Sequence, residues 1–195
     1  MRKILLIFLF LTTVISAQLL TLGQARGAFL SVEVGPRIPL GDLANYSSYG
    51  PGFNSTFSYT DNKLFPFFVY GTLGYAHFPG DQDLYKQTNY SSFSTNVISL
   101  SAGVRYYFKP LLENIVILTP VVDAGGSIGI FEKAHRYKID SGLLNFTEDT
   151  FNVGAHVGAG FSMFILDVLG YYNYFHGNQF LSLNCRVTIP VYVIF

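Results

Sequence analysis

The segment "LSLNCRVTIPVYVIF", residues 181–195, carries an apolar side chain at every odd position. Its even positions begin with the polar residues Ser182, Asn184 and Arg186. Because successive side chains of a β-strand point to opposite faces, this alternation predicts a strand with one apolar and one polar face. The ends of soluble domains are usually polar and loosely held, so we expect this segment to be docked in a sheet.

The same two-residue period recurs along the chain. It is found at residues 28–37, 53–59, 98–106, 116–130 and 151–165, while 64–78 and 168–175 look like strands with aromatic residues on both faces. With 181–195, these segments make eight predicted strands. Long polar connections near 39–51, 79–95 and 132–148 alternate with short ones at 61–63, 109–114 and around Asp167, and the last connection, 176–179, is short. This alternation is typical of up-and-down barrels in outer membranes.

Composition favours a membrane barrel over a soluble β-sandwich. Half of the residues are apolar and only 12% are charged, against roughly a quarter charged in typical soluble domains. The polar strand faces hold mainly Gly, Ser, Thr and Asn, which suit a narrow interior, whereas the outer face of a sandwich is normally rich in Lys and Glu. Cys185, the single cysteine, cannot form an internal disulfide. We predict an all-β fold: an eight-stranded antiparallel up-and-down transmembrane β-barrel with both termini periplasmic.

The first seventeen residues have the composition of a secretory signal peptide. Arg2 and Lys3 form a basic head, the run Ile4–Ile15 is apolar, and Ser16 and Ala17 form a small-residue cleavage site. The apolar run is shorter than the roughly twenty residues that a spanning helix needs. We assign residues 1–17 to a signal peptide and 18–195 to a barrel domain in the cell outer membrane. Without the basic head, 10 basic and 12 acidic residues remain, so no nucleic-acid partner is expected.

These features resemble the small outer-membrane β-barrels of the OmpA/OmpX type, and more specifically the outer membrane β-barrel domain proteins of Bacteroidota-like bacteria. The resemblance covers residues 18–195 as a pattern. As a motif it covers "VEVGPRIPLGDLAN" at 32–45 and the last strand, which ends in phenylalanine. It implies outer-membrane lipid and lipopolysaccharide as partners. It also implies that Val191, Val193 and Phe195 form a C-terminal signal read by the barrel-assembly machinery.

Proline residues mark departures from the regular pattern. The last strand of the family usually carries a glycine several residues before its end, and this chain has Pro190 inside the strand instead. Because proline has no N–H to donate, it is normally kept to edges and bulges. We therefore expect irregular pairing at Pro190, and likewise at Pro66 and Pro120.

Charged residues within the predicted strands all lie on polar faces. They are Glu33, Arg37, Arg105, Asp123 and Arg186. An eight-stranded barrel is just wide enough to be filled by side chains, and an isolated buried charge is very costly. We therefore expect Glu33 and Asp123 to pair with arginines in an interior polar network, with His156 nearby, that holds the barrel shut. A gated ion path is the alternative.

The predicted function is that of an integral outer-membrane protein with a structural or surface-binding role, a filled interior and no enzymatic activity. The alternatives are a narrow porin-like passive channel and a secreted lipocalin-like ligand-binding barrel. Neither His156 nor His176 has a serine two positions along, nor a nearby carboxylate, to make a catalytic relay. No histidine has metal-ligand spacing, so no cofactor or metal is predicted. The most charged stretch, "EKAHRYKIDSGLLNFTED" at 132–149, is the expected contact loop for lipopolysaccharide or an unknown surface ligand.

Overall fold

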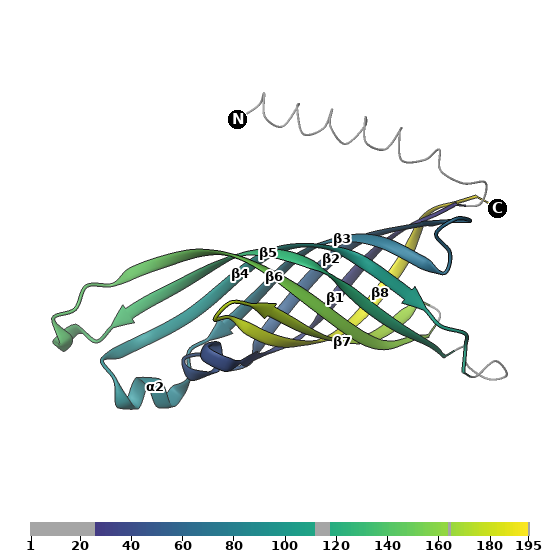
Figure 1. Ribbon diagram of the computed structural model, residues 1–195. Coiled ribbons are helices and arrows are strands. Elements are labelled where there is room, and N and C mark those ends of the chain that lie inside the picture. Colours follow the sequence, from purple (N-terminus) through teal and green to yellow (C-terminus); the bar gives the residue numbers. More distant parts are fainter. Residues whose placement is uncertain (1–25, 112–117, 164, 195) are drawn as a thin grey trace, which may run out of the picture.

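The computed structural model describes residues 26–111, 118–163 and 165–194, so the predicted signal peptide lies outside the described residues. Eight strands form one closed antiparallel barrel in sequence order, and β1 closes the ring by pairing with β8 (Figure 1). The predicted fold is confirmed. The strands are β1 (Arg26–Leu40), β2 (Gly50–Asp61), β3 (Phe67–Pro79), β4 (Tyr90–Tyr107), β5 (Thr119–Tyr137), β6 (Phe146–Met163), β7 (Leu166–Phe175) and β8 (Gln179–Ile194).

The two ends of the barrel differ in their connections. At the end that we call the terminal end, β1 begins and β8 finishes, and Arg26 pairs with Ile194. The opposite end, the loop end, holds the connections 41–49, 80–89, 138–145 and 176–178. The last of these is a tight turn in which Gly177 has a φ of 72°, a conformation that favours glycine. Short helices at this end are η1 (Gly41–Asn45), α2 (Gln82–Gln87) and η2 (Ile139–Ser141).

The apolar phase of the strands faces outward. On β1, Leu30, Val32 and Val34 are 41–52% exposed, whereas Ser31 and Glu33 between them are buried. The outward rows continue around the wall, and their most exposed members are Leu73, Ile98, Leu100, Phe151, Val153, Val157, Leu183, Ile189 and Val191. Such residues normally fill the core of a soluble protein. The predicted outward face is confirmed, with the exception of Tyr59, which is buried.

Small residues on the inner faces leave room for large ones. A Cβ atom at Gly52 would collide with the guanidinium group of Arg37. At Gly158, a Cβ atom would collide with the ring of Tyr171. The glycines of the polar phases therefore allow bulky polar side chains to cross a bore that is narrow in any eight-stranded barrel.

Three strands extend beyond the others at the loop end. β4, β5 and β6 have 18, 19 and 18 residues, against 10 in β7. Figure 1 shows them projecting past the β7–β8 hairpin, with α2 beside them. Among the described pairings, β7 joins β6 only over Gly154–Met163, so residues 146–153 of β6 have no partner strand on that side. We call residues 90–97, 131–137 and 146–150 the projection.

The prediction that residues 132–149 form a loop was wrong for most of that stretch. Residues 132–137 belong to β5 and 146–149 belong to β6, and η2 lies between them. Stacked rings hold this charged part of the sheet together. Tyr90 and Tyr137 stack at 4.7 Å between centroids, and His135 and Phe146 stack at 4.3 Å. Cross-strand aromatic pairs of this kind stabilise a sheet.

The prolines affect pairing in three different ways. Opposite Pro190, the register between β1 and β8 shifts between Ala28 and Phe29, which leaves Val191 without a partner in β1. This bulge confirms the expected irregularity at Pro190. Pro66 lies in the turn before β3 rather than in a strand. The expectation was wrong for Pro120, which pairs in register with Phe161 because the β5–β6 ladder continues on both sides of it.

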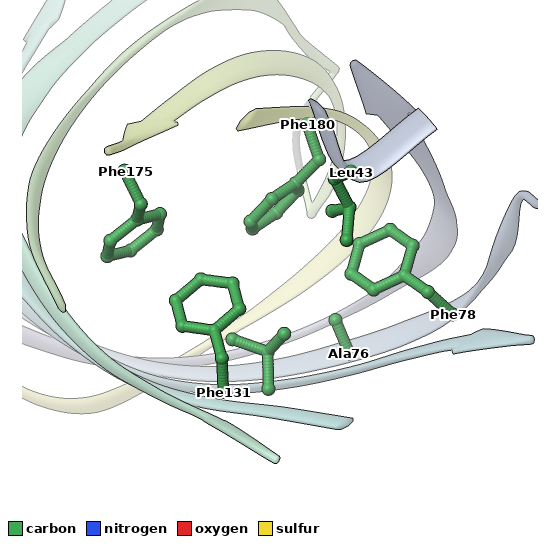
Figure 2. Close-up of a cluster of buried hydrophobic side chains, with 7 residues drawn as sticks. Leu43, Ala76, Phe78, Phe131, Phe175 and Phe180 are labelled. Atoms are coloured by element: carbon green, nitrogen blue, oxygen red, sulfur yellow. The ribbon is translucent and has the colours of Figure 1, made fainter. Parts of the chain in front are cut away.

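An apolar plug closes the bore near the loop end. It comprises Leu43, Ala76, Phe78, Val97, Phe131, Phe175 and Phe180, all almost fully buried. Figure 2 shows the phenylalanine rings pointing toward the middle of the ring of strands. Phe131 and Phe175 pack edge to face at 5.1 Å, a favoured aromatic geometry. A second, smaller apolar cluster, Val121, Leu169 and Tyr171 with Tyr107, lies farther along the bore.

Candidate functional site

Three arginines and three carboxylates form a buried cluster in the middle of the barrel, and the formal charges of these six residues balance. They are Arg37, Arg105, Arg186, Glu33, Asp123 and Asp167, each at most 4% exposed. Buried charges are tolerated only when they are paired and hydrogen-bonded. The contacts described below meet that condition, except that Arg186 Nη1 has an ion-pair contact with Glu33 but no hydrogen bond.

Arg105 and Asp123 form the most complete pair. The Nε of Arg105 donates to both carboxylate oxygens of Asp123, at 3.0 and 3.1 Å. The hydroxyl of Tyr171 donates to Asp123 at 2.8 Å and accepts from Arg105 at 3.3 Å. The guanidinium group also lies over the ring of Tyr70, 5.0 Å from its centroid. The carboxylate of Asp123, the hydroxyl of Tyr171 and the ring of Tyr70 together fix the position of the guanidinium group.

Arg186 joins two carboxylates from the strands on either side of β8. Its Nε donates to Asp167 at 2.6 Å, its Nη2 also contacts Asp167, and its Nη1 lies 3.7 Å from Glu33. Each of these pairs is a direct cross-strand neighbour in the sheet, Arg186 with Asp167 and with Glu33. Arg105 and Asp123 are likewise opposite each other. The register of the barrel therefore creates the ion pairs.

Arg37 reaches Glu33 through two asparagines instead of a direct pair. Its guanidinium group donates to the side-chain oxygens of Asn184 at 2.5 Å and Asn54 at 3.3 Å. The amide nitrogens of the same two asparagines donate to Glu33, at 2.9 and 3.1 Å. Thr56 adds a third donor to Glu33. In each asparagine, the side-chain oxygen thus accepts from Arg37 and the side-chain nitrogen donates to Glu33.

His156 is held between two hydroxyl groups. Its Nε2 lies 2.5 Å from the Tyr70 hydroxyl, and its Nδ1 lies 2.8 Å from Ser127. Ser127 is shared in turn with Ser101 at 2.8 Å. The histidine therefore does have a serine partner, which comes from the neighbouring strand rather than from a nearby sequence position. Both residues are buried, and the cavity beside His156 is only about 50 Å³, which is far below the size of a substrate pocket.

The structure brings all six residues predicted for the interior network into the bore: Glu33, Arg37, Arg105, Asp123, His156 and Arg186. The prediction that Asp167 belongs to a turn was wrong, because β7 begins one residue earlier and turns this carboxylate inward. Tyr70, Tyr171, Asn54 and Asn184 were also missed as partners. Asn184 lies on the predicted polar face, so its inward direction could have been read from the sequence.

The residues predicted as a C-terminal signal lie apart from this network. Val191 and Val193 are exposed on β8 at the terminal end, and Phe195 lies outside the described residues. Within the described part of the chain, no helix is long and apolar enough to cross a membrane. The same part holds no group of three or more His, Cys, Asp or Glu side chains that could bind a metal ion.

A cavity with aromatic walls lies at the loop end, above the plug. Two adjoining hollows of about 300 and 230 Å³ share Tyr46, Phe93, Lys133 and Glu148 as lining residues. We call them together the mouth cavity. Phe93 packs against the ring of His135 at 5.1 Å and against Tyr46 at 6.2 Å. The inner face of the projection therefore forms one wall of this cavity.

Comparisons with solved structures agree with this geometry. Neisserial surface protein A has a TM-score of 0.54 at 15% identity, covering 85% of this chain and 97% of that chain. A major outer membrane protein from Thermus thermophilus has a TM-score of 0.53 at 13% identity, covering 83% of this chain and 99% of that chain. This chain has the fold of the small outer-membrane β-barrels.

The resemblance to small outer-membrane barrels inferred from the sequence is thus confirmed as a fold. Neither a protein-family model nor a curated protein matches the sequence. The narrower link to Bacteroidota-like proteins stays a prediction. In small outer-membrane barrels the outward rows are in contact with lipid.

Proposed function

We propose that the protein is an integral outer-membrane β-barrel whose bore is sealed and whose loop end serves as a surface-binding structure. The observation that supports this most directly is the combination of an apolar outer wall with an interior filled by paired charges and an apolar plug. A wall of that kind needs lipid around it. An interior of that kind gives the molecule rigidity rather than a passage.

We call the apolar zone of the outer wall that would contact lipid the membrane band. Its border nearest the loop end lies between two adjacent rows of outward side chains. Ile98, Ile130 and Phe151 lie side by side on β4, β5 and β6 and are apolar. The next outward row toward the loop end consists of Asn96, Glu132 and Asp149, which are polar or charged. On β4, the outward apolar residues run from Ile98 to Tyr106. This length fits the roughly 9–11 residues with which a tilted strand crosses a bilayer.

Aromatic residues lie at both borders of this band. At the terminal end, Tyr106 packs against Phe67 at 4.9 Å and against Phe108 at 4.8 Å. Toward the loop end, Tyr75 and Tyr174 are exposed on the outer wall. Such girdles flank the apolar band of outer-membrane barrels. We place the projection outside the membrane, on the side opposite the terminal end.

A passive channel has less support than a sealed scaffold. A solute that entered from the loop end would meet the plug, in which Phe78 and Phe131 are 0% exposed. It would then meet the ion pairs, which would have to separate to let it pass. No enzymatic role is proposed, because the buried Ser127–His156 pair has no room for a substrate beside it.

The assembly route is a separate part of the proposal. We infer that Val191, Val193 and Phe195 are read by the barrel-assembly machinery, as the resemblance implies. The outward, exposed position of Val191 and Val193 on β8 is compatible with such contact. Replacing Phe195 with alanine should lower the amount of folded barrel in the outer membrane, without changing the stability of barrel refolded in detergent. An unchanged amount in cells would contradict this role.

The membrane assignment can be tested with two arginine substitutions on one strand face. Ala102 lies in the middle of the band, whereas Ser94 points to the same side above it. We expect Ala102→Arg to reduce stability by about 2–4 kcal/mol in lipid, and Ser94→Arg to change it little. Urea titration, read by the shift in gel mobility between folded and boiled protein, measures both. Equal effects, or a mature chain that dissolves without detergent, would reject the assignment.

A further inference from the structure

Residues that line the mouth cavity carry buried polar atoms that make no hydrogen bond. In the described residues, six buried side-chain nitrogen or oxygen atoms lack a hydrogen bond, and three of them belong to lining residues: Thr95 Oγ1, His135 Nε2 and Asn178 Oδ1. Of these, His135 Nε2 has the Glu148 carboxylate 3.8 Å away, beyond hydrogen-bond distance. The three lining side chains come from β4, from β5 and from the turn between β7 and β8. Thr95 is 0% exposed and Asn178 is 5% exposed. Buried polar groups without partners are uncommon in proteins and call for an explanation.

The hydrogen-bonding roles of these atoms can be assigned. The Tyr137 hydroxyl donates to the Tyr90 hydroxyl at 3.3 Å, and Tyr90 lies 2.9 Å from His135 Nδ1. Tyr90 is therefore able to donate its own proton to Nδ1, which leaves the proton of the neutral ring on Nε2. Burial lowers the pKa of His135, in accordance with a neutral ring. His135 thus offers a hydrogen-bond donor and Asn178 offers an acceptor. The hydroxyl of Thr95 can act as either.

Aromatic faces and charged ends complete the lining. Phe93 and Tyr46 border both hollows, and the charged lining residues are Lys133, Glu148 and Asp42. A cavity with an excess of positive charge would suit a polyanion, but this lining has one cation and two carboxylates, so a polyanion is disfavoured. Mixed donors and acceptors set around aromatic rings suit a ligand that carries many hydroxyl groups on an apolar ring face.

We propose that the mouth cavity binds a neutral saccharide, on the scale of a mono- or disaccharide unit. Sugar hydroxyls both donate and accept, so a ligand that extends across both hollows can meet Thr95 and Asn178 in one and His135 in the other. The carbon face of a sugar ring can lie against Phe93 or Tyr46. The inference rests on the proposed function, because the sugars available to this site are those outside the membrane, either free or attached to lipid.

The test uses the full chain refolded in a phosphocholine detergent, because detergents with sugar headgroups would occupy the site. The probes are glucose, galactose, N-acetylglucosamine and maltose, with sucrose octasulfate as a polyanionic comparison. Binding is measured by saturation-transfer NMR and titration. We expect at least one neutral sugar to bind, and both Thr95→Val and His135→Phe to weaken it by about fivefold to tenfold, the effect of one lost hydrogen bond. Thr147→Val, on the outer face of the projection, is the matched control and should bind normally.

The outcomes separate this proposal from the membrane assignment. Each variant is first checked for the mobility shift of a folded barrel, which reports the proposed function independently of any sugar. Folded protein that binds no neutral probe, or that binds only sucrose octasulfate, overturns the saccharide site. Equal binding by the wild type and Thr95→Val also overturns it. If a sugar binds, the source of the natural ligand is tested by adding vesicles that contain lipopolysaccharide. Competition between these vesicles and the free sugar identifies a lipid-attached saccharide as the ligand. No competition identifies a free saccharide.

Discussion

The bore and the mouth cavity of this barrel are both lined by buried polar side chains, but the two regions differ in how many of these side chains are hydrogen-bonded. In the bore, Glu33 alone receives three hydrogen bonds and lies near Arg186. In the mouth cavity, Thr95 and Asn178 are as deeply buried and have unused polar atoms. A network that satisfies its members contributes to stability, whereas an unsatisfied buried group costs free energy and leaves capacity for a ligand. Substitution of the same residue types should therefore lower stability much more in the bore than in the mouth cavity.

The largest difference in stability between the two regions is expected when a cationic side chain is replaced. Arg186→Leu would leave Asp167 and Glu33 buried without their partner, and we expect it to cost about 3–5 kcal/mol in unfolding free energy. Lys133→Leu in the mouth cavity breaks no ion pair within the described structure, and it should change stability by no more than about 0.5 kcal/mol. Urea unfolding in lipid vesicles measures both. Similar losses in the two variants would erase the distinction between the regions.

Asparagines should show the next largest difference. Asn184→Leu removes a donor to Glu33 and an acceptor for Arg37, and we expect a loss of about 1–3 kcal/mol. The side-chain oxygen of Asn178 has no such bonds, so Asn178→Ala should lie within about 0.5 kcal/mol of the wild type. Thermal unfolding followed by circular dichroism provides the measurement. A large loss for Asn178→Ala would mean that its amide supports the turn.

Two threonines make the closest matched pair. Thr56 and Thr95 are both 0% exposed, but Thr56 bonds to Glu33 and to Thr72 whereas Thr95 has no partner. Replacement by valine keeps the shape. We expect Thr56→Val to lower the free energy of unfolding by about 1 kcal/mol and Thr95→Val to leave it unchanged or raise it slightly. The contrary order, measured by urea titration, would show that the Thr95 hydroxyl is satisfied in the folded protein.

The smallest effect concerns pH. Burial lowers the pKa of His135, while the nearby Glu148 opposes the shift. Because the folded pKa is then below the unfolded value of roughly 6.5, the unfolded chain binds more protons as the pH falls through that range. Stability should therefore be slightly lower at pH 5 than at pH 7.5. His135→Phe should remove the part of this stability loss at pH 5 that His135 causes. If the variant and the wild type have the same dependence of stability on pH, His135 is not the source of the loss.

The sequence was sufficient to predict the wall of the barrel. Alternation identifies the lipid-facing rows because every outward position in the band must be apolar, and it places charges such as Arg105 on the inner face. It could not predict partners, because the pairing of Arg105 with Asp123 depends on the register between strands. A shift of one residue would separate them.

Two further features escaped sequence reasoning for different physical reasons. Asp167 lies beside a tight turn, where one residue decides whether a carboxylate faces solvent or the bore. The projection is surrounded by water, so its outward positions carry Glu132 and Arg136 instead of apolar residues, and its alternation resembles a polar loop. The plug was hidden because Phe78 and Phe175 end segments that are aromatic on both faces.

The unequal height of the wall sets the direction from which the mouth cavity can be reached. The turn at 176–178 borders the cavity where the barrel is lowest, while α2 and the tip of the β5–β6 hairpin stand on the taller side. In the membrane placement proposed above, we expect a saccharide attached to a neighbouring lipid to reach the cavity from the side, over this low rim.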